Sequence, residues 1–227
     1  MSSNTLEQGA RKKAGRRRPA PCHDELMPTP EEIEDDGQPI LSIRMPVGGF
    51  TVADLLAMPE YPYRIELTDG ALTVSPSPSG LHQRLGTKLL AVLCEAEANG
   101  YVANHEVDVV LSKGTTRIPD VMIVRDVLLE GPRVYTKDEL AVAVEIESPG
   151  STALDRKLKP LVYAEYGVPQ YWRIELEPEL IATIYRLEDG AYTEVSRGPR
   201  IEVTEPFPFS VNLADLMRRG VSRGRRR

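Results

Sequence analysis

The 227-residue sequence has few of the residues that several protein classes need. Its two cysteines, Cys22 and Cys94, are too few for a disulfide framework and favour a reducing cytoplasm. Neither His23 nor His105 has metal-ligand spacing around it. No run of 18 apolar residues suits a transmembrane helix, and residues 1–21 lack the apolar core of a secretory signal. The glycine motifs GxGxxG and GxxxxGKS are also absent, so nucleotide binding through a glycine-rich loop is not expected.

Charge is unevenly distributed along the chain. The net charge is −6, but residues 46–217 hold 15 Lys and Arg against 26 Asp and Glu, a net of −11. Basic side chains cluster in residues 11–18, and residues 218–227 hold six arginines and no acid. Basic tails are typical of proteins that bind nucleic acid or another polyanion, and they are equally compatible with ends that are only solvated. The acidic body argues against tight DNA binding by the bare domain without metal.

Composition divides the chain into three segments. Residues 1–42, rich in charge, proline and glycine, are expected to be a disordered tail. Residues 43–217 have enough apolar residues for one domain of moderate size, and residues 218–227 form a basic C-terminal tail.

Hydrophobic periodicity and turn signals give the expected order of elements in the domain. Thr51 is expected to cap a short helix, Ser79 to cap a helix reaching about Asn99, and two Asp-Gly pairs to turn hairpins. The expected elements are a helix after Thr51, a hairpin at 63–75, a helix at 79–99, strands at 101–111, 117–124 and 141–148, a helix at 155–166, a strand at 170–176 and a hairpin at 181–196. This order predicts an α/β fold of the mixed α+β kind, with a central mixed sheet flanked by helices and a β-hairpin near each end.

Two acids end the most apolar strand of the chain, AVAVEIESPG at residues 141–150. Alternation along a strand predicts that Glu145 and Glu147 share one face about 7 Å apart, with Ile146 on the other face. Carboxylates held so close repel unless a cation, a donor or a proton intervenes. Asp120 lies where the strand at 117–124 begins, so it can converge with Glu145 if the two strands are neighbours. Paired carboxylates of this kind are typical ligands of Mg²⁺.

Several short motifs resemble one known family. They are IELTDGAL at 65–72, His82, IPD at 118–120, EIESP at 145–149, the series Asp155, Lys159 and Tyr163, and EYGVPQYW at 165–172. In this order and spacing the chain, over roughly residues 48–215, resembles the "putative restriction endonuclease" family of bacteria. That family is assigned to the PD-(D/E)XK nuclease superfamily, which implies a restriction endonuclease-like fold.

The resemblance implies a role for each matching residue. Asp120 and Glu145 would bind Mg²⁺, or Mn²⁺ in its place, with the Ile146 carbonyl as a third ligand. The lysine of the superfamily's E-x-K pattern falls on Glu147, which is a departure, and Lys159 on the following helix is the match in this family. Lys159 would assist the water that attacks the phosphate.

Four further residues belong to the implied site or its surroundings. Asp155, Lys159 and Tyr163 recur at helical spacing, so they would share one helix face. Glu66 matches an early acid of the family, and His82 comes from the first long helix. The plainer interpretations stay open at this stage: an ordinary surface ion pair for Asp155 and Lys159, a hydrogen-bonded helix residue for His82, and a solvent-facing acid for Glu147.

The resemblance predicts a Mg²⁺-dependent endonuclease that hydrolyses DNA, with the basic tails adding sequence-independent affinity. A homodimer is compatible with the superfamily's habit of cutting both strands as a dimer, although the sequence carries no dimer signal. The alternative is a nuclease-fold module without turnover that binds DNA or a protein, which Glu147 in the lysine position favours. A metal-dependent hydrolase acting on RNA or a small phosphoester also remains open.

Overall fold

The computed structural model describes residues 31–35, 38–42, 45–58, 63–75, 78–126, 134–147 and 157–218, with side chains from Met45 onward. The chain divides into two units, residues 1–44 and 45–227. In the first unit, β1 (Glu31–Asp35) pairs antiparallel with β2 (Gln38–Ser42). This strand pair falls inside the segment expected to be disordered, whose other residues lie outside the described ones. The basic residues 219–227 also lie outside them.

The second unit begins with the predicted short helix, α1 (Val52–Ala57). The Thr51 hydroxyl accepts a hydrogen bond from the Asp54 N–H at 3.3 Å, and the Asp54 carboxylate accepts one from the Thr51 N–H at 2.7 Å. This reciprocal pair is a capping box, which satisfies two N–H groups at the start of the helix. The helix prediction is confirmed.

The first predicted hairpin is confirmed as β3 (Arg64–Thr68) and β4 (Ala71–Ser75), paired antiparallel. Its turn residues Asp69 and Gly70 have φ of 49° and 80°, as a two-residue hairpin turn of type I′ requires. A side chain at Gly70 would begin 3.1 Å from the Gly49 Cα, so glycine also permits close packing of this turn on the preceding segment.

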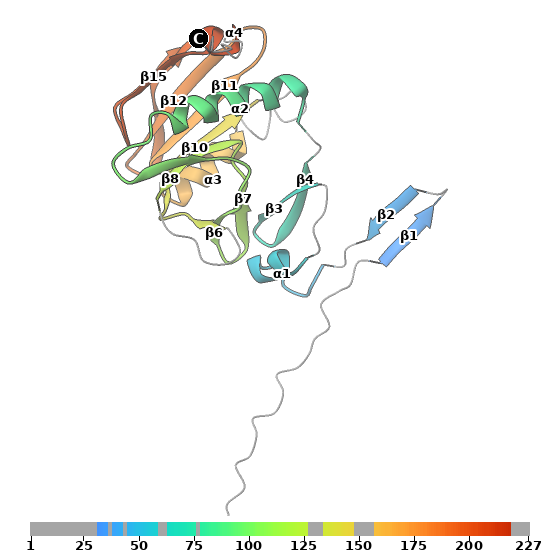
Figure 1. The fold of residues 1–227 in the computed structure, drawn as a ribbon. Coiled ribbons are helices and arrows are strands. Elements are labelled where there is room, and N and C mark those ends of the chain that lie inside the picture. Colours follow the sequence, from blue (N-terminus) through green and yellow to red (C-terminus); the bar gives the residue numbers. More distant parts are fainter. Residues whose placement is uncertain are drawn as a thin grey trace, which may run out of the picture. The chain divides into compact units, whose positions relative to one another are not determined.

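The core of the unit is a six-stranded sheet in the order β13-β12-β11-β10-β8-β5 (Figure 1). Only β10 and β11 run parallel, and the other neighbours are antiparallel, so the predicted mixed sheet is confirmed. Its strands are β5 (Tyr101–Asn104), β8 (Val121–Arg125), β10 (Leu140–Ile146), β11 (Gln170–Glu175), β12 (Ile181–Glu188) and β13 (Ala191–Gly198). β12 and β13 are the second predicted hairpin, turned on Asp189 and Gly190.

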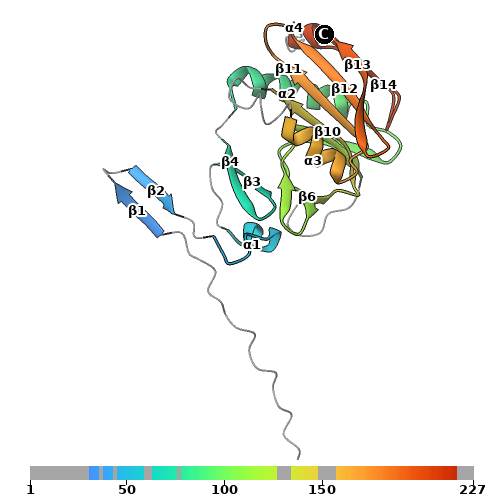
Figure 2. The ribbon, with the colours of Figure 1, turned by 180° about the vertical axis from the view of Figure 1, so that it is seen from behind.

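Helices cover both faces of this sheet. α2 (Gly80–Cys94) lies across one face and is in front in Figure 1. α3 (Lys159–Glu165) lies on the opposite face and is in front in Figure 2, which is turned by 180°. Leu85, Leu89 and Leu93 of α2 belong to one buried apolar cluster, and Val162 and Tyr163 of α3 belong to another. Because strand residues alternate between faces, β5, β8, β10, β11 and β12 each contribute side chains to both clusters.

Two smaller sheets and a short helix complete the unit. They are β6 (Val109–Ser112), β7 (Thr115–Arg117) and β9 (Tyr135–Thr136) in one sheet, β14 (Arg200–Val203) and β15 (Phe209–Asn212) in the other, and α4 (Leu213–Arg218). No described helix is long and apolar enough to cross a membrane.

Three predicted boundaries were wrong. The strand expected at 101–111 is two strands, β5 and β6, because the chain turns away at Glu106, which has φ of 50°. The strand expected at 117–124 is likewise β7 and β8, separated by the residues around Pro119, whose missing N–H cannot join a ladder. The helix expected to reach Asn99 ends at Cys94, because the chain turns toward β5 after it, with Asn99 and Gly100 at φ of 60° and 74°.

Candidate active site

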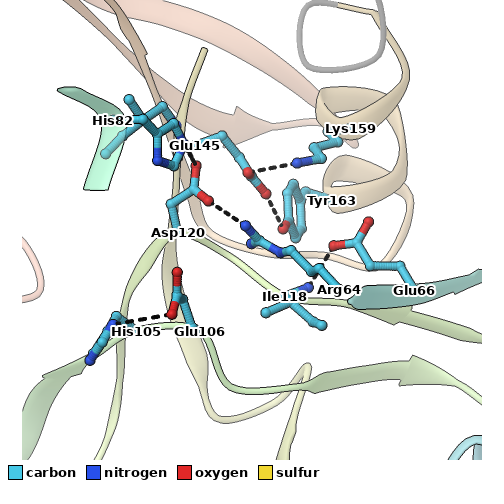
Figure 3. A network of polar contacts seen from close by, with 11 residues as sticks. Arg64, Glu66, His82, His105, Glu106, Ile118, Asp120, Glu145, Lys159 and Tyr163 are labelled. Carbon is cyan, nitrogen blue, oxygen red and sulfur yellow. Dashed lines mark hydrogen bonds and ion pairs between the residues drawn. The ribbon is translucent and has the colours of Figure 1, made fainter. Parts of the chain in front are cut away.

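Asp120 is the most heavily contacted carboxylate of the site. It follows Pro119 at the entry to β8 and is 7% exposed. One carboxylate oxygen, Oδ1, accepts a hydrogen bond from Arg64 Nη1 at 2.6 Å. The other, Oδ2, lies 3.0 Å from His82 Nε2 and accepts a hydrogen bond from the Ile146 N–H at 2.7 Å (Figure 3). Asp120 therefore ties together β3, α2 and β10. The strands β8 and β10 are neighbours, which is the condition for Asp120 and Glu145 to converge.

Glu145 lies on β10 and is 1% exposed. Its Oε2 accepts a hydrogen bond from Lys159 Nζ at 2.7 Å, and its Oε1 accepts one from the Tyr163 hydroxyl at 2.8 Å. Lys159 and Tyr163 are four residues apart on α3, so both reach the strand from one helix face, as predicted. The third member of that predicted face, Asp155, lies outside the described residues. Figure 3 shows Glu145 beside Asp120, with Lys159 and Tyr163 approaching from α3.

Glu66 reaches the same region from β3 and is 6% exposed. Its Oε1 accepts a hydrogen bond from the Ile118 N–H at 2.8 Å, two residues before Asp120. This contact anchors the segment that carries Asp120 to the hairpin. The predicted residue is therefore close to the site, and it hydrogen-bonds the backbone of that segment.

His82 occupies the first turn of α2, where its N–H donates to the Ser79 hydroxyl at 3.3 Å. That cap fixes the start of the helix and directs the imidazole toward Asp120. Beside the imidazole is a cavity of about 160 Å³, whose lining includes His105, Glu106 and Asp120. The Asp120 carboxylate thus borders a space large enough for a small group. His105 contributes to this wall although its sequence context gave no signal.

Arg64 is another site residue that the sequence did not reveal. Its guanidinium bonds Asp120, and its Nη2 is buried and hydrogen-bonds no residue that the structure describes. The alternation in RIELT offered a signal, since Arg64 and Glu66 are two apart and must share a strand face. An arginine on the buried face of a hairpin needs an acidic partner, and Asp120 is that partner.

Glu147 follows the end of β10, and its Oε1 lies 3.1 Å from Arg173 Nε on β11. Arg173 is the register partner of Glu145 across the parallel pair, so the two side chains share a sheet face. Glu147 reaches that same side, in agreement with the predicted alternation. At 6% exposure it is buried, so the interpretation of Glu147 as a solvent-facing acid is wrong.

Burial and charge act in opposite directions on the ionisable groups. Burial favours protonated Asp120, but the hydrogen bond from His82 and the charge of Arg64 outweigh it, and the pKa of Asp120 lies below its usual range. Burial raises the pKa of Glu145 to about 7, although the charge of Lys159 opposes the shift. Burial opposes protonation of His82, yet its bond to Asp120 raises the pKa of His82. One carboxylate is thus held ionised, and its neighbour titrates near neutrality.

The donor set fits a hard divalent cation in type and charge. Asp120 and Glu145 supply buried carboxylate oxygens, which Mg²⁺ prefers. Within the described ranges, no three side chains of His, Cys, Asp or Glu converge on one metal position. The positive charge in contact with Asp120 is that of Arg64. The expected third ligand, the Ile146 carbonyl, stays a prediction, since Ile146 contacts Asp120 through its N–H.

These contacts gather a strand-entry aspartate, a second carboxylate on the adjacent strand and a lysine from the following helix. A family model described as Uma2, "Putative restriction endonuclease", matches residues 52–215, most of the chain. The chain belongs to this family. The Uma2 match spans every site residue discussed above, from Arg64 to Arg173.

A solved structure supports the fold independently. The chain resembles a crystal structure titled as a "putative nuclease" belonging to DUF820 from Anabaena variabilis, with a TM-score of 0.56 and 17% identity. The match covers 74% of this chain and 98% of that one, so the predicted restriction endonuclease-like fold is confirmed. None of the curated proteins matches the chain.

Proposed function

We propose that this protein is a divalent-metal-dependent endonuclease that hydrolyses DNA phosphodiester bonds in the cytoplasm, with Asp120 and Glu145 as the ligands of Mg²⁺ or Mn²⁺. The observation that carries the proposal is the 2.7 Å contact of Lys159 with Glu145, next to Asp120 at the adjacent strand. A lysine thus joins the two acids from α3, although a glutamate occupies the usual lysine position. Membership of a family described as a restriction endonuclease supports the reaction class.

A bound metal ion would polarise the scissile phosphate and lower the pKa of a bound water. The chain's own groups have separate tasks around it. The Lys159 ammonium orients the attacking water or stabilises charge on the phosphate. Tyr163 donates to the far oxygen of Glu145 and so fixes how that carboxylate is turned. His82 and the Ile146 N–H hold Oδ2 of Asp120 in the same way.

The basic tails, which apart from Arg218 lie outside the described residues, would add sequence-independent affinity for DNA. Residues 218–227 hold six arginines and no acid, while residues 46–217 carry a net charge of −11. Deleting residues 219–227 is expected to weaken DNA binding and to flatten its dependence on salt, because fewer counterions are released. Fluorescence anisotropy at several salt concentrations measures both effects. If the affinity and its salt dependence were unchanged, residues 219–227 would not contribute to DNA binding.

A second candidate is a nuclease-fold module that binds DNA or a protein without turnover. The bond from Arg64 to Asp120 favours it, because it engages one oxygen of an expected metal ligand. Glu147 at the usual lysine position favours it as well. This candidate predicts nucleic-acid or protein binding with no metal-dependent product.

Nicking of supercoiled plasmid in the presence of Mg²⁺ or Mn²⁺ separates the two candidates. Asp120→Asn keeps the size of the side chain and is expected to reduce nicking by about 10²–10³-fold, the loss typical when a transition-state contact is removed. Asp215→Asn, an exposed acid on α4, is the matched control and should leave nicking unchanged. Metal-dependent nicking that survives in Asp120→Asn would refute the assignment. Single-stranded DNA and RNA substrates test the nucleic acid preferred.

A further inference from the structure

Arg64 is the arginine bonded to Asp120, in a site whose other cationic side chain, Lys159, is bonded to Glu145. Its Nη1 is 2.6 Å from Asp120 Oδ1, and its side chain is only 18% exposed. Glu66 is two residues along the same strand, so its carboxylate lies on the same side of the hairpin as Arg64. The charges of Asp120, Glu145 and Glu66 all act on the guanidinium. Figure 3 shows it among these carboxylates.

Its second terminal nitrogen is incompletely satisfied. Nη2 is buried and has no hydrogen-bond partner among the residues that the structure describes. A buried donor without a partner costs free energy comparable to a lost hydrogen bond, and more when it is charged. Nη1 is therefore hydrogen-bonded, whereas Nη2 lacks an acceptor among those residues. This is expected if Arg64 has a second side-chain conformation in which the guanidinium binds an additional partner.

We infer that Arg64 is an internal counter-cation that competes with the divalent metal for Asp120. In the metal-free protein it neutralises Asp120. When the ion is bound, the two positive charges repel, and the guanidinium gives up Oδ1. This inference rests on the proposed metal site and identifies a residue that sets its affinity. It reconciles the occupied Asp120 carboxylate with a metal-dependent reaction.

The released guanidinium would suit a phosphate. Its planar donors match phosphate oxygens in pairs, so an anionic substrate stabilises the arrangement in which Arg64 has left Asp120. Metal and phosphate then strengthen each other's binding, since both favour that arrangement and such coupling is reciprocal. The site would hold metal weakly alone and more tightly with nucleic acid.

Calorimetric titration with Mn²⁺ tests the competition without relying on activity. Arg64→Gln is expected to bind Mn²⁺ at least about tenfold more tightly than wild type, because the competitor for Asp120 is gone. The matched control is Arg173→Gln, which removes a positive charge from the sheet face of Glu145 but not one bonded to Asp120. It should change the affinity by less than about threefold. Arg64→Lys, which keeps the charge, should remain close to wild type.

Thymidine 5′-monophosphate, which has no phosphodiester to cleave, tests the coupling. It should tighten Mn²⁺ binding to wild type and have a smaller effect on Arg64→Gln. If Arg64→Gln is less stable than wild type, thermal unfolding still tests the competition. Mn²⁺ should raise the Tm of Arg64→Gln by more than it raises the Tm of wild type, because it binds the variant more tightly. Competition would be refuted if folded Arg64→Gln bound Mn²⁺ no more tightly than Arg173→Gln.

The controls separate this inference from the proposed function. If Asp120→Asn abolishes Mn²⁺ binding while Arg64→Gln leaves it at the wild-type level, the metal site stands and the competition is refuted. If Asp120→Asn and Glu145→Gln both retain wild-type affinity, the metal site itself is wrong, and the inference is overturned with it.

Discussion

The two faces of strand β10 carry different kinds of side chain, because successive residues alternate between them. On the side toward α2, Val142, Val144 and Ile146 pack in a cluster that is wholly apolar. On the side toward α3, Ala143 joins the second apolar cluster, and Glu145 follows it as a buried charge. The first face needs only apolar neighbours of suitable size, whereas the second needs specific donors from another helix.

The difference shows which residues are present for stability and which need another explanation. Apolar burial stabilises the α2 face by roughly 1.5–3 kcal/mol for each fully buried large side chain. A buried ion pair such as Lys159 and Glu145 gives little net stability, because desolvation offsets the attraction. Retaining charges on the α3 face is therefore better explained by chemistry than by folding.

The largest effect is expected from changing the α3 face. Glu145→Gln keeps the size of the side chain but removes its charge and one of its two acceptor oxygens, so nicking should fall by about 10²–10³-fold. Circular dichroism and thermal unfolding should show a folded protein, because the buried group is now neutral. Nicking at the wild-type rate would show that the two faces do not differ in function.

A matched change on the α2 face should reverse the pattern. Leu89 is fully buried, and Leu89→Ala should lower the free energy of unfolding by about 2–5 kcal/mol in urea titration. Leu81→Ala, at a 43% exposed position of the same helix, should change it by less than about 0.5 kcal/mol. Nicking per folded molecule should persist in both variants. A small loss for Leu89→Ala would show that this face is loosely packed.

The charged face should also respond to pH. With the pKa of Glu145 raised to about 7, protons compete with metal, so Mn²⁺ affinity should fall by about tenfold per pH unit below 7. Glu145→Gln should remove this dependence. The stability of the metal-free protein should depend on pH in the opposite direction to the metal affinity. The Glu145 carboxyl holds its proton more tightly in the folded state than in the unfolded state, where its pKa is near 4.5. This group's contribution to stability is therefore lost as pH rises from 4.5 through 7. A flat Mn²⁺ affinity between pH 6 and 8 would contradict the Glu145 assignment.

The smallest effect concerns a glycine inside α2. A Cβ on Gly86 would meet Ile146 Cδ1 at 3.5 Å, an ordinary van der Waals contact. Gly86→Ala should therefore stabilise the protein by about 0.5–1 kcal/mol, because alanine loses less backbone freedom in a helix. Urea titration measures the gain. A loss of stability would show that the α2 face has no room for a methyl group.

Local sequence patterns were sufficient to predict the elements that are determined by residues close together in the sequence. The Asp-Gly turns, the Thr51 cap and the apolar alternation of residues 141–146 each depend on neighbours in sequence, and each prediction is confirmed. The expected strand at 101–111 is divided at Glu106 because β5 and β6 belong to different sheets. The apolar pattern of one strand does not show which sheet the strand joins.

The site was predicted less completely, for the same reason. Motif resemblance pointed to Asp120, Glu145 and Lys159, and the structure brings these three together. Arg64 was missed because its significance comes from Asp120, 56 residues away. Glu66 was found, but its bond to the Ile118 N–H required the fold. Their roles in catalysis stay predictions.

Mn²⁺ titration by calorimetry, with short duplex DNA present, tests the central claim most directly. We expect saturable binding to wild type that is lost in both Asp120→Ala and Glu145→Ala, each confirmed as folded by circular dichroism. Wild-type affinity in both variants, or no binding to wild type with DNA present, would contradict a metal site between β8 and β10.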